Sequence, residues 1–340
     1  MGDCQSRSGS PSRILLLAQQ RTGSTLLCKM LGLEHQPDVH FDPLAKTCRD
    51  VALLTEQLGL GQKQFGNWTD SEKSRVMESF RVCVDSLLFA SATAESQNKI
   101  FFHKDHAGWI WRPDAKAPGD HGVFHGIAPD SYDQQLPPAS QVTSTNPTVL
   151  PVDFLASSRL IFCVRHPALA FASACRGSLE LQLLDPGNWK GELMRSLLTY
   201  SYTRVLYDWN MALIRENGSH DRLMDPIIVS GSDIVHNPGL VPQLAKELGL
   251  DPSKVQTTWN TTSFPEDTLI MREIFCRVAN QSTGVIKEKA PEKIDIEEEK
   301  RKWVAEFGCD LAGIISDCVE HAIPDYEYLM SKRFQGVGMK

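Results

Sequence analysis

The clearest indication of the fold is the stretch Leu17-Ala18-Gln19-Gln20-Arg21-Thr22-Gly23-Ser24-Thr25-Leu26-Leu27. It joins an apolar run at residues 13–18, which is typical of a buried parallel strand, to residues 24–33, which have helical spacing. A loop in this place can surround a phosphate with backbone N–H groups at the positive end of a helix. Gly23 permits a close approach to that anion. The hydroxyls of Ser24 and Thr25 and the guanidinium of Arg21 can bind it.

This loop departs from the nucleotide-triphosphate loop GxxxxGK[ST] at two positions. Gly23 and Thr25 fit that pattern. Ala18 replaces its first glycine, and Ser24 replaces its lysine. Because that lysine is the main cation for a γ-phosphate, the sequence predicts an anion site that does not hydrolyse Mg-ATP. A P-loop kinase or hydrolase remains an alternative.

Short apolar runs alternate with segments of helical spacing along the whole chain. The strand candidates are residues 13–18, 100–102, 159–164 and 227–229, and the helix candidates are residues 24–33, 70–94, 168–175, 193–216 and 240–248. Asp70 or Ser71 is the expected cap of the second helix. This alternation predicts an α/β fold, a doubly wound parallel sheet flanked by helices, of the P-loop nucleotide-binding type.

The chain is expected to form one domain, residues 13–330, between flexible termini at residues 1–12 and 331–340. Residues 112–158 are rich in Pro, Gly, Ser, Asp and Gln and keep no regular period. A loop insertion of this length is typical of a lid, a binding segment or a disordered segment.

Composition and charge argue against several classes of protein. Of the 340 residues, 41% are hydrophobic and 23% are charged, as in an ordinary globular domain. No apolar run approaches the roughly 18 residues of a membrane span. The net charge of -7 argues against a nucleic-acid-binding surface. The N-terminus lacks the apolar stretch of a secretory signal and no Cys-x-x-Cys pair occurs, so a cytoplasmic protein is expected.

Polar side chains also follow the second strand candidate. Lys104 and His106 stand two residues apart, so in an extended chain they lie on one side, toward the crevice that the loop borders. His103 and Asp105 point the other way in the same geometry. Because histidine titrates near neutral pH, His106 is a natural general base.

A second candidate phosphate clamp follows the third strand candidate. Arg165 stands at the end of that strand, and Ser173 lies in the helix after it. Open α/β sheets bind their ligands at the carboxyl ends of the strands. An arginine and a hydroxyl at that edge are suited to a phosphate.

Together these motifs resemble the PAPS-dependent sulfotransferases, where PAPS is 3′-phosphoadenosine 5′-phosphosulfate. Residues 20–27 resemble the 5′-phosphosulfate loop of that family, whose cytosolic members carry lysine at the position of Arg21. Arg165 and Ser173 resemble its 3′-phosphate motif, and Lys104 and His106 resemble its Lys-x-His motif. The departures from the cytosolic pattern suggest a divergent microbial or fungal branch.

The resemblance implies transfer of a sulfuryl group from PAPS to a hydroxyl or amine of a small-molecule acceptor. The product nucleotide is adenosine 3′,5′-bisphosphate, and no metal is required. The implied catalytic residues are His106 as general base, Lys104 and Arg21. The implied nucleotide-binding residues are Arg21, Thr22, Gly23, Ser24, Thr25, Arg165 and Ser173, with Arg277 and Lys287 as candidates for the family's C-terminal Arg-Lys-Gly, which is not obvious here.

The acceptor is expected beside residues 112–158, near Trp109, Trp111 and His103, which suits an aromatic or mixed small molecule. Packing in the core is an equal alternative for both tryptophans. A homodimer is a further expectation that the residues leave open. The other reading of the activity is a sulfotransferase-fold enzyme that uses sulfation to drive elimination or cyclisation of a small metabolite.

Overall fold

A computed structural model describes residues 11–336 except 44, 46–47, 61–62, 64, 115–145, 182–197, 217–223 and 265–269. The predicted flexible N-terminus therefore lies almost wholly outside the described residues. Among the helices of the described part, none is both long and apolar enough to cross a membrane.

The centre of the molecule is a five-stranded parallel sheet in the order β2-β3-β1-β4-β5. The strands are β1 Arg13–Ala18, β2 Val39–Phe41, β3 Ile100–His106, β4 Arg159–Val164 and β5 Ile227–Ser230. The predicted α/β fold with a doubly wound parallel sheet is confirmed. Two details differ, since β2 was not predicted and β3 continues four residues beyond the apolar run, through the polar side chains to His106.

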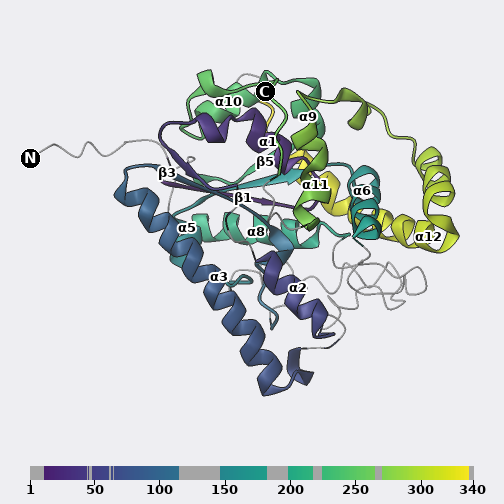
Figure 1. Ribbon diagram of the computed structural model, residues 1–340, viewed down its shortest axis with the longest axis horizontal. Coiled ribbons are helices and arrows are strands. Elements are labelled where there is room, and N and C mark those ends of the chain that lie inside the picture. The colour runs from purple at the N-terminus through teal and green to yellow at the C-terminus, as the bar shows by residue number, and fades with distance from the viewer. Residues whose placement is uncertain are drawn as a thin grey trace, which may run out of the picture.

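Helices cover both faces of this sheet (Figure 1). Helices α1 Ser24–Met30, α9 Gly231–His236 and α10 Leu240–Glu247 pack on one face. Helices α3 Asp70–Ser96, α5 Val152–Ala156 and α8 Ser201–Glu216 pack on the other. The pleat explains this division, because Ile14 and Leu16 enter the first core while Leu15 and Leu17 enter the second. An apolar run with both faces covered is what a parallel strand requires.

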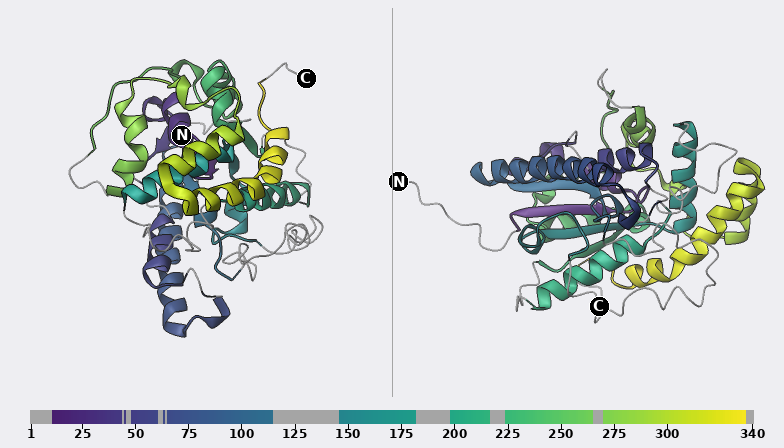
Figure 2. Two further views of the ribbon diagram at one scale, coloured as in Figure 1. Left: turned by 90° about the vertical axis from the view of Figure 1, so that its right-hand side faces the viewer. Right: turned by 90° about the horizontal axis from the view of Figure 1, so that it is seen from below.

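The remaining helices lie around the carboxyl ends of the strands and the outside of the domain. They are α2 Arg49–Gln57, α6 Pro167–Glu180, α11 Ile270–Gln281 and α12 Ile296–Ser331, with short 3-10 turns at Leu33–His35, Phe65–Asn67, Ala107–Trp109, Pro252–Lys254 and Lys287–Lys289. Helix α12 packs along α6 and bends at Gly308, where φ is 78° and ψ is 168° (Figure 2). A positive φ of this kind favours glycine.

Three expectations about the elements need correction. Helix α3 is capped by Thr69 rather than by Asp70 or Ser71, because Thr69 and Glu72 form a reciprocal capping box. Helix α8 begins at Ser201, and residues 193–197 lie outside the described part. Residues 112–158 contain α5 near their end, since Phe154 and Leu155 are buried against the sheet and Pro151 favours a helix start. The central part of the expected insertion, residues 115–145, lies outside the described residues.

The C-terminal segment is bonded to the sheet over its described residues. The Phe334 amide donates to the Ile228 carbonyl at 2.7 Å, and Arg333 pairs with Asp233 at 2.8 Å. The sequence predicted a flexible terminus from residue 331, but Arg333 and Phe334 pair with Ile228 at the edge of β5 instead. Residues 337–340 lie outside the described part.

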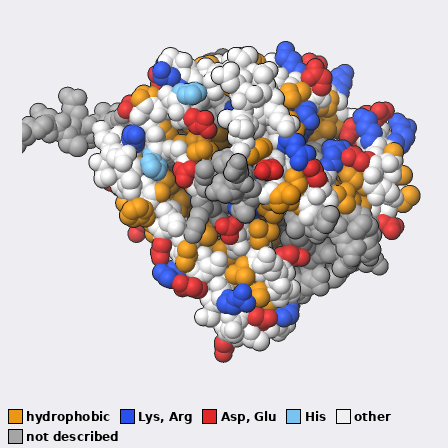
Figure 3. Space-filling view, viewed as in Figure 1, with side chains coloured by type: hydrophobic (Ala, Val, Ile, Leu, Met, Phe, Trp, Pro, Cys, Tyr) orange, Lys and Arg blue, Asp and Glu red, His pale blue; other side chains and the backbone are white. Residues whose placement is uncertain are grey.

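Surface charges of both signs are interspersed on the face shown in Figure 3. Lysine and arginine side chains there alternate with aspartate and glutamate side chains, with hydrophobic groups between them. The described residues of this face therefore present no continuous basic surface.

Candidate active site

The loop between β1 and α1 is held in a compact turn by its own residues. Arg21 has φ 62° and Gly23 has φ 95°, so the chain reverses twice before α1 begins. The buried Thr22 hydroxyl donates to the Gln19 carbonyl at 2.7 Å, which closes the turn. In the described part of the chain, no side chain caps the start of α1 at Gly23. Its first N–H groups are therefore left for a ligand, together with the hydroxyls of Ser24 and Thr25.

A glycine far along the chain makes room for this loop. A Cβ atom on Gly231, at the start of α9, would lie 2.3 Å from the Thr22 carbonyl oxygen. Gly231 follows β5, so the close approach joins the ends of two strands through their loops. The sequence near Gly231 does not show this contact, because nothing local indicates which backbone the glycine faces.

Gly231→Ala is expected to push the loop out of place, because a backbone carbonyl cannot yield as the end of a flexible side chain can. We expect a loss of about 1–3 kcal/mol in the free energy of unfolding, the usual scale of overpacking, and weaker binding of adenosine 3′,5′-bisphosphate by calorimetry. Gly313→Ala on α12 is the matched control, because no atom lies within 4 Å of its Cβ position. Equal nucleotide affinity in the two variants would contradict this role of Gly231.

Arg21 connects the loop to two helices. Its Nε donates to the Ser173 hydroxyl of α6 at 2.9 Å, and its Nη1 donates to the Phe275 carbonyl of α11 at 2.5 Å. The guanidinium also lies 5.4 Å from the centre of the Phe275 ring. The structure thus brings two predicted site residues, 152 positions apart, into direct contact.

Arg165 stands just beyond β4 and reaches the same loop. Its Nη1 donates to the Arg21 carbonyl at 3.3 Å, and its Nη2 donates to the Lys289 carbonyl in the Lys287–Lys289 turn. Arg165 and Ser173 do not bond to each other in the described structure, but both bond to Arg21. The predicted clamp is therefore assembled around Arg21.

Neither arginine pairs with a negative side chain among the described residues. Burial lowers the pKa of Arg21 and of Arg165, and the charge of Arg21 lowers that of Arg165 further. Within the described residues, neither guanidinium forms an ion pair with a carboxylate. Arginine stays protonated in proteins, so these two side chains bring uncompensated positive charge to the loop.

Lys104 adds a third unpaired cation on the same side of the sheet. Burial raises the pKa of the Cys28 and Cys163 thiols to about 12, while Lys104 acts against that rise at both. Its charge therefore acts on residues of α1 and β4, and Lys104 itself lies on β3 beside β1. Among the described residues, Lys104 has neither an ion pair nor a hydrogen-bond partner through its side chain. Three cations thus border the loop between β1 and α1.

His106 is held at the carboxyl end of β3, directly opposite Ala18 in the β1–β3 register. Its Nδ1 lies 2.8 Å from the Ala18 carbonyl oxygen, and its half-buried ring packs edge-on against Trp109 with centroids 4.2 Å apart. A carbonyl oxygen only accepts, so the neutral ring carries its proton on Nδ1. The Nε2 lone pair is then free to take a proton.

The pKa of His106 is expected near 4 in the protein without ligand. Burial lowers it to about 4, and the nearby charge of Lys104 lowers it as well. NMR titration should show this value, and a bound phosphate anion should raise it, because a negative charge favours the imidazolium. The unfolded chain takes up this proton near pH 6.5. This group therefore makes stability fall as the pH drops from 6.5 toward 4 and leaves it unchanged above. A pKa of His106 near 6.5, unchanged by nucleotide, would contradict the geometry.

The other face of β3 belongs to the core. His103 Nε2 lies 3.9 Å from Asp105 Oδ2, and both side chains are buried. They line a cavity of about 10 Å³ with Cys48 and Cys83, which has room for about one water molecule. The structure therefore does not bring His103 to the side of His106, where an acceptor was expected.

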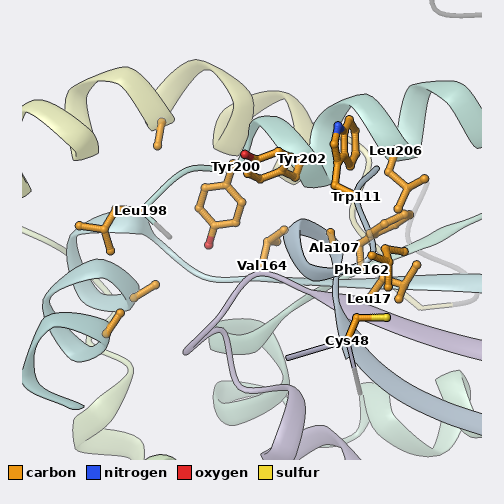
Figure 4. Close-up of a cluster of buried hydrophobic side chains, with 14 of the residues drawn as sticks. Leu17, Cys48, Ala107, Trp111, Phe162, Val164, Leu198, Tyr200, Tyr202 and Leu206 are labelled. Carbon is orange, nitrogen blue, oxygen red and sulfur yellow. The ribbon is translucent and has the colours of Figure 1, made fainter. Parts of the chain in front are cut away.

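The two tryptophans also lie on different sides, one beside His106 and one in the core. Trp109 lies beside the His106 ring. Trp111 is buried in the core against Tyr202, with ring centroids 5.1 Å apart (Figure 4). Of the three residues expected near the acceptor, only Trp109 lies next to His106.

The two C-terminal candidates for nucleotide binding, Arg277 and Lys287, lie apart from each other. Arg277 lies on the exposed side of α11 and pairs with Glu180 at 2.6 Å. Lys287 lies in the turn whose Lys289 carbonyl accepts from Arg165. Neither side chain contacts Arg21 or Arg165 in the described structure. An open depression of about 440 Å³ on the surface is lined by Thr261, Thr262, Ser263, Phe264, Asn280 and Gln281.

Comparison with known proteins supplies the family. No model of a known protein family matches the chain. It is 30% identical to Sulfotransferase ppzF of Metarhizium majus (strain ARSEF 297) over 338 residues, which cover 96% of this chain and 98% of that protein. It is also 30% identical to Sulfotransferase ppzF of Metarhizium rileyi (strain RCEF 4871), with 96% and 97% covered.

Among solved structures, the chain is similar to the Sulfotransferase Domain from the Synechococcus PCC 7002 Olefin Synthase. The TM-score is 0.39 at 15% identity, with 90% of this chain and 98% of that chain covered. The two fungal relatives span nearly the whole chain at 30% identity. This similarity places the chain in the sulfotransferase family.

Proposed function

We propose that the chain moves the sulfuryl group of PAPS to a hydroxyl or amine of a small-molecule acceptor, with His106 as general base. One observation carries this proposal: Arg21 and Arg165 bond at the loop, Lys104 lies on the adjacent strand β3, and none of the three has a carboxylate partner in the described structure. A ligand with a phosphosulfate at one end and a phosphate at the other supplies the missing negative charge.

The nucleotide would be held at two places. The loop residues Gly23, Ser24 and Thr25, with Arg21 and Lys104, suit the 5′-phosphosulfate, because they combine free N–H groups, hydroxyls and charge. Arg165 and Ser173 suit the 3′-phosphate. Thr22 has a different part, since its hydroxyl is used within the loop.

When bound, PAPS would supply the sulfuryl group that is transferred. His106 would accept the acceptor's proton at Nε2, because Nδ1 is committed to the Ala18 carbonyl. Its low pKa keeps the ring neutral, and so able to accept, throughout the physiological range. Arg21 and Lys104 would stabilise the negative charge that develops on the leaving oxygen. Such fixed positive charges need no reorganisation during the step.

Calorimetry with adenosine 3′,5′-bisphosphate tests the proposal, with ADP plus Mg²⁺ as the control. We expect micromolar binding of the bisphosphate without metal, and weaker binding by about tenfold or more in Arg165→Ala, the scale of a charged hydrogen bond. Tighter binding of ADP plus Mg²⁺ would overturn it and reopen the kinase reading. The cytoplasmic location and the homodimer stay predictions.

A further inference from the structure

We propose that Tyr200 is a positioning residue for the 3′-phosphate clamp, and this inference rests on the function proposed above. Its hydroxyl makes two hydrogen bonds to the backbone of one residue, Arg165. It accepts from the Arg165 N–H at 3.0 Å and donates to the Arg165 carbonyl. None of the sequence motifs above includes Tyr200.

The position of Arg165 in the chain explains why its backbone needs such a partner. Arg165 is the first residue after β4, whose ladder with β5 ends at the pair Val164 and Ser230. Buried backbone N–H and C=O groups beyond a ladder have to be satisfied by something else. Pro167, two residues later, begins α6. The Tyr200 hydroxyl occupies this gap between strand and helix.

Tyr200 is itself rigidly placed. Its side chain is fully buried, and its ring stacks on Phe171 of α6 at 6.0 Å and packs on Tyr326 of α12 at 5.9 Å. Figure 4 shows the hydroxyl pointing from the start of α8 toward the chain beside Val164. Burial raises the pKa of Tyr200, so the phenol keeps the proton that it donates. A fixed hydroxyl thus sets the backbone from which the Arg165 side chain begins.

The fixed backbone of Arg165 also restricts where its side chain can reach. Its guanidinium bonds to the carbonyls of Arg21 and Lys289. An arginine side chain has many rotamers, and a fixed backbone leaves fewer conformations to be restricted on binding. Tyr200 should therefore strengthen binding of the 3′-phosphate specifically, and leave the rest of the nucleotide unaffected.

The test is the ratio of the dissociation constants of adenosine 5′-monophosphate and adenosine 3′,5′-bisphosphate, which isolates the 3′-phosphate. Tyr200→Phe keeps the ring and is expected to lower this ratio by about five- to tenfold, the scale of a lost hydrogen bond. Tyr207→Phe, in helix α8, which begins directly after Tyr200, and packed on Phe162, is the matched control and should keep the wild-type ratio. In an Arg165→Ala background, Tyr200→Phe should change the ratio no further, because the two act as one unit.

Each outcome decides a separate point. An unchanged ratio in Tyr200→Phe, or an equal loss of affinity for both nucleotides, would overturn the positioning role. A wild-type protein with no preference for the 3′-phosphate would instead sink the proposed function. Amide hydrogen exchange of wild-type Arg165 needs no variant: protection is expected, and exchange at the rate of an open loop would also refute the bond from its N–H to Tyr200.

Discussion

His106→Ala is expected to lower turnover by about 10²-fold or more, the usual contribution of a general base. The ring is the group beside the loop that can accept a proton, because its Nε2 is left free by the bond from Nδ1 to Ala18. Binding of adenosine 3′,5′-bisphosphate should be preserved, since the three cations remain. Turnover is read as release of this nucleotide from PAPS, with an acceptor taken from a panel of phenols, alcohols and amines.

His106→Asn separates the loss of the base from the loss of packing. An asparagine amide can still donate to the Ala18 carbonyl, but it cannot take a proton from an acceptor. We therefore expect His106→Asn to lose turnover as His106→Ala does, with a thermal stability closer to that of the wild type. Turnover within tenfold of the wild type in either variant would show that another group removes the proton.

Arg21→Ala is expected to lower kcat by about 10²-fold or more, which is the cost of removing one preorganised donor from developing charge. The guanidinium is half-buried, has no carboxylate partner in the described structure and lies in the loop itself. Its loss should also loosen α6 and α11, because it bonds to Ser173 and to the Phe275 carbonyl. The measurement is kcat at saturating nucleotide, so that weaker binding does not enter the result.

Arg21→Lys distinguishes charge from shape. Lysine keeps the charge but not the forked donor that reaches two helices at once. We expect an intermediate kcat and a smaller loss of stability than in Arg21→Ala. Arg81→Ala is the matched control, because Arg81 is an exposed residue of α3 that pairs with Glu78 and Asp85. If Arg21→Ala and Arg81→Ala turn over PAPS equally fast, Arg21 has no part in the reaction.

Local features determined much of this fold from the sequence alone. The apolar runs at β1, β4 and β5 and the turn around Gly23 could be recognised because burial and backbone geometry are encoded over a few neighbouring residues. The separation of His106 from His103 followed from the pleat, since alternate residues of a strand face opposite sides. The family then followed from whole-chain similarity to the two fungal sulfotransferases.

Only the tertiary structure decided the contacts between segments that are distant in the sequence. Arg21 bonds to Ser173, 152 positions away, and Gly231 lies close to Thr22, 209 positions away. The Tyr200 hydroxyl bonds to the backbone of Arg165, 35 positions away. No local period or motif encodes such pairs, because they depend on how helices α6, α8 and α9 pack against the ends of the strands. Trp111 shows the same limit, since its neighbours in sequence suggest a pocket while packing on Tyr202 places it in the core. Sequence thus determined which side chains could bind an anion, and packing decided which of them meet.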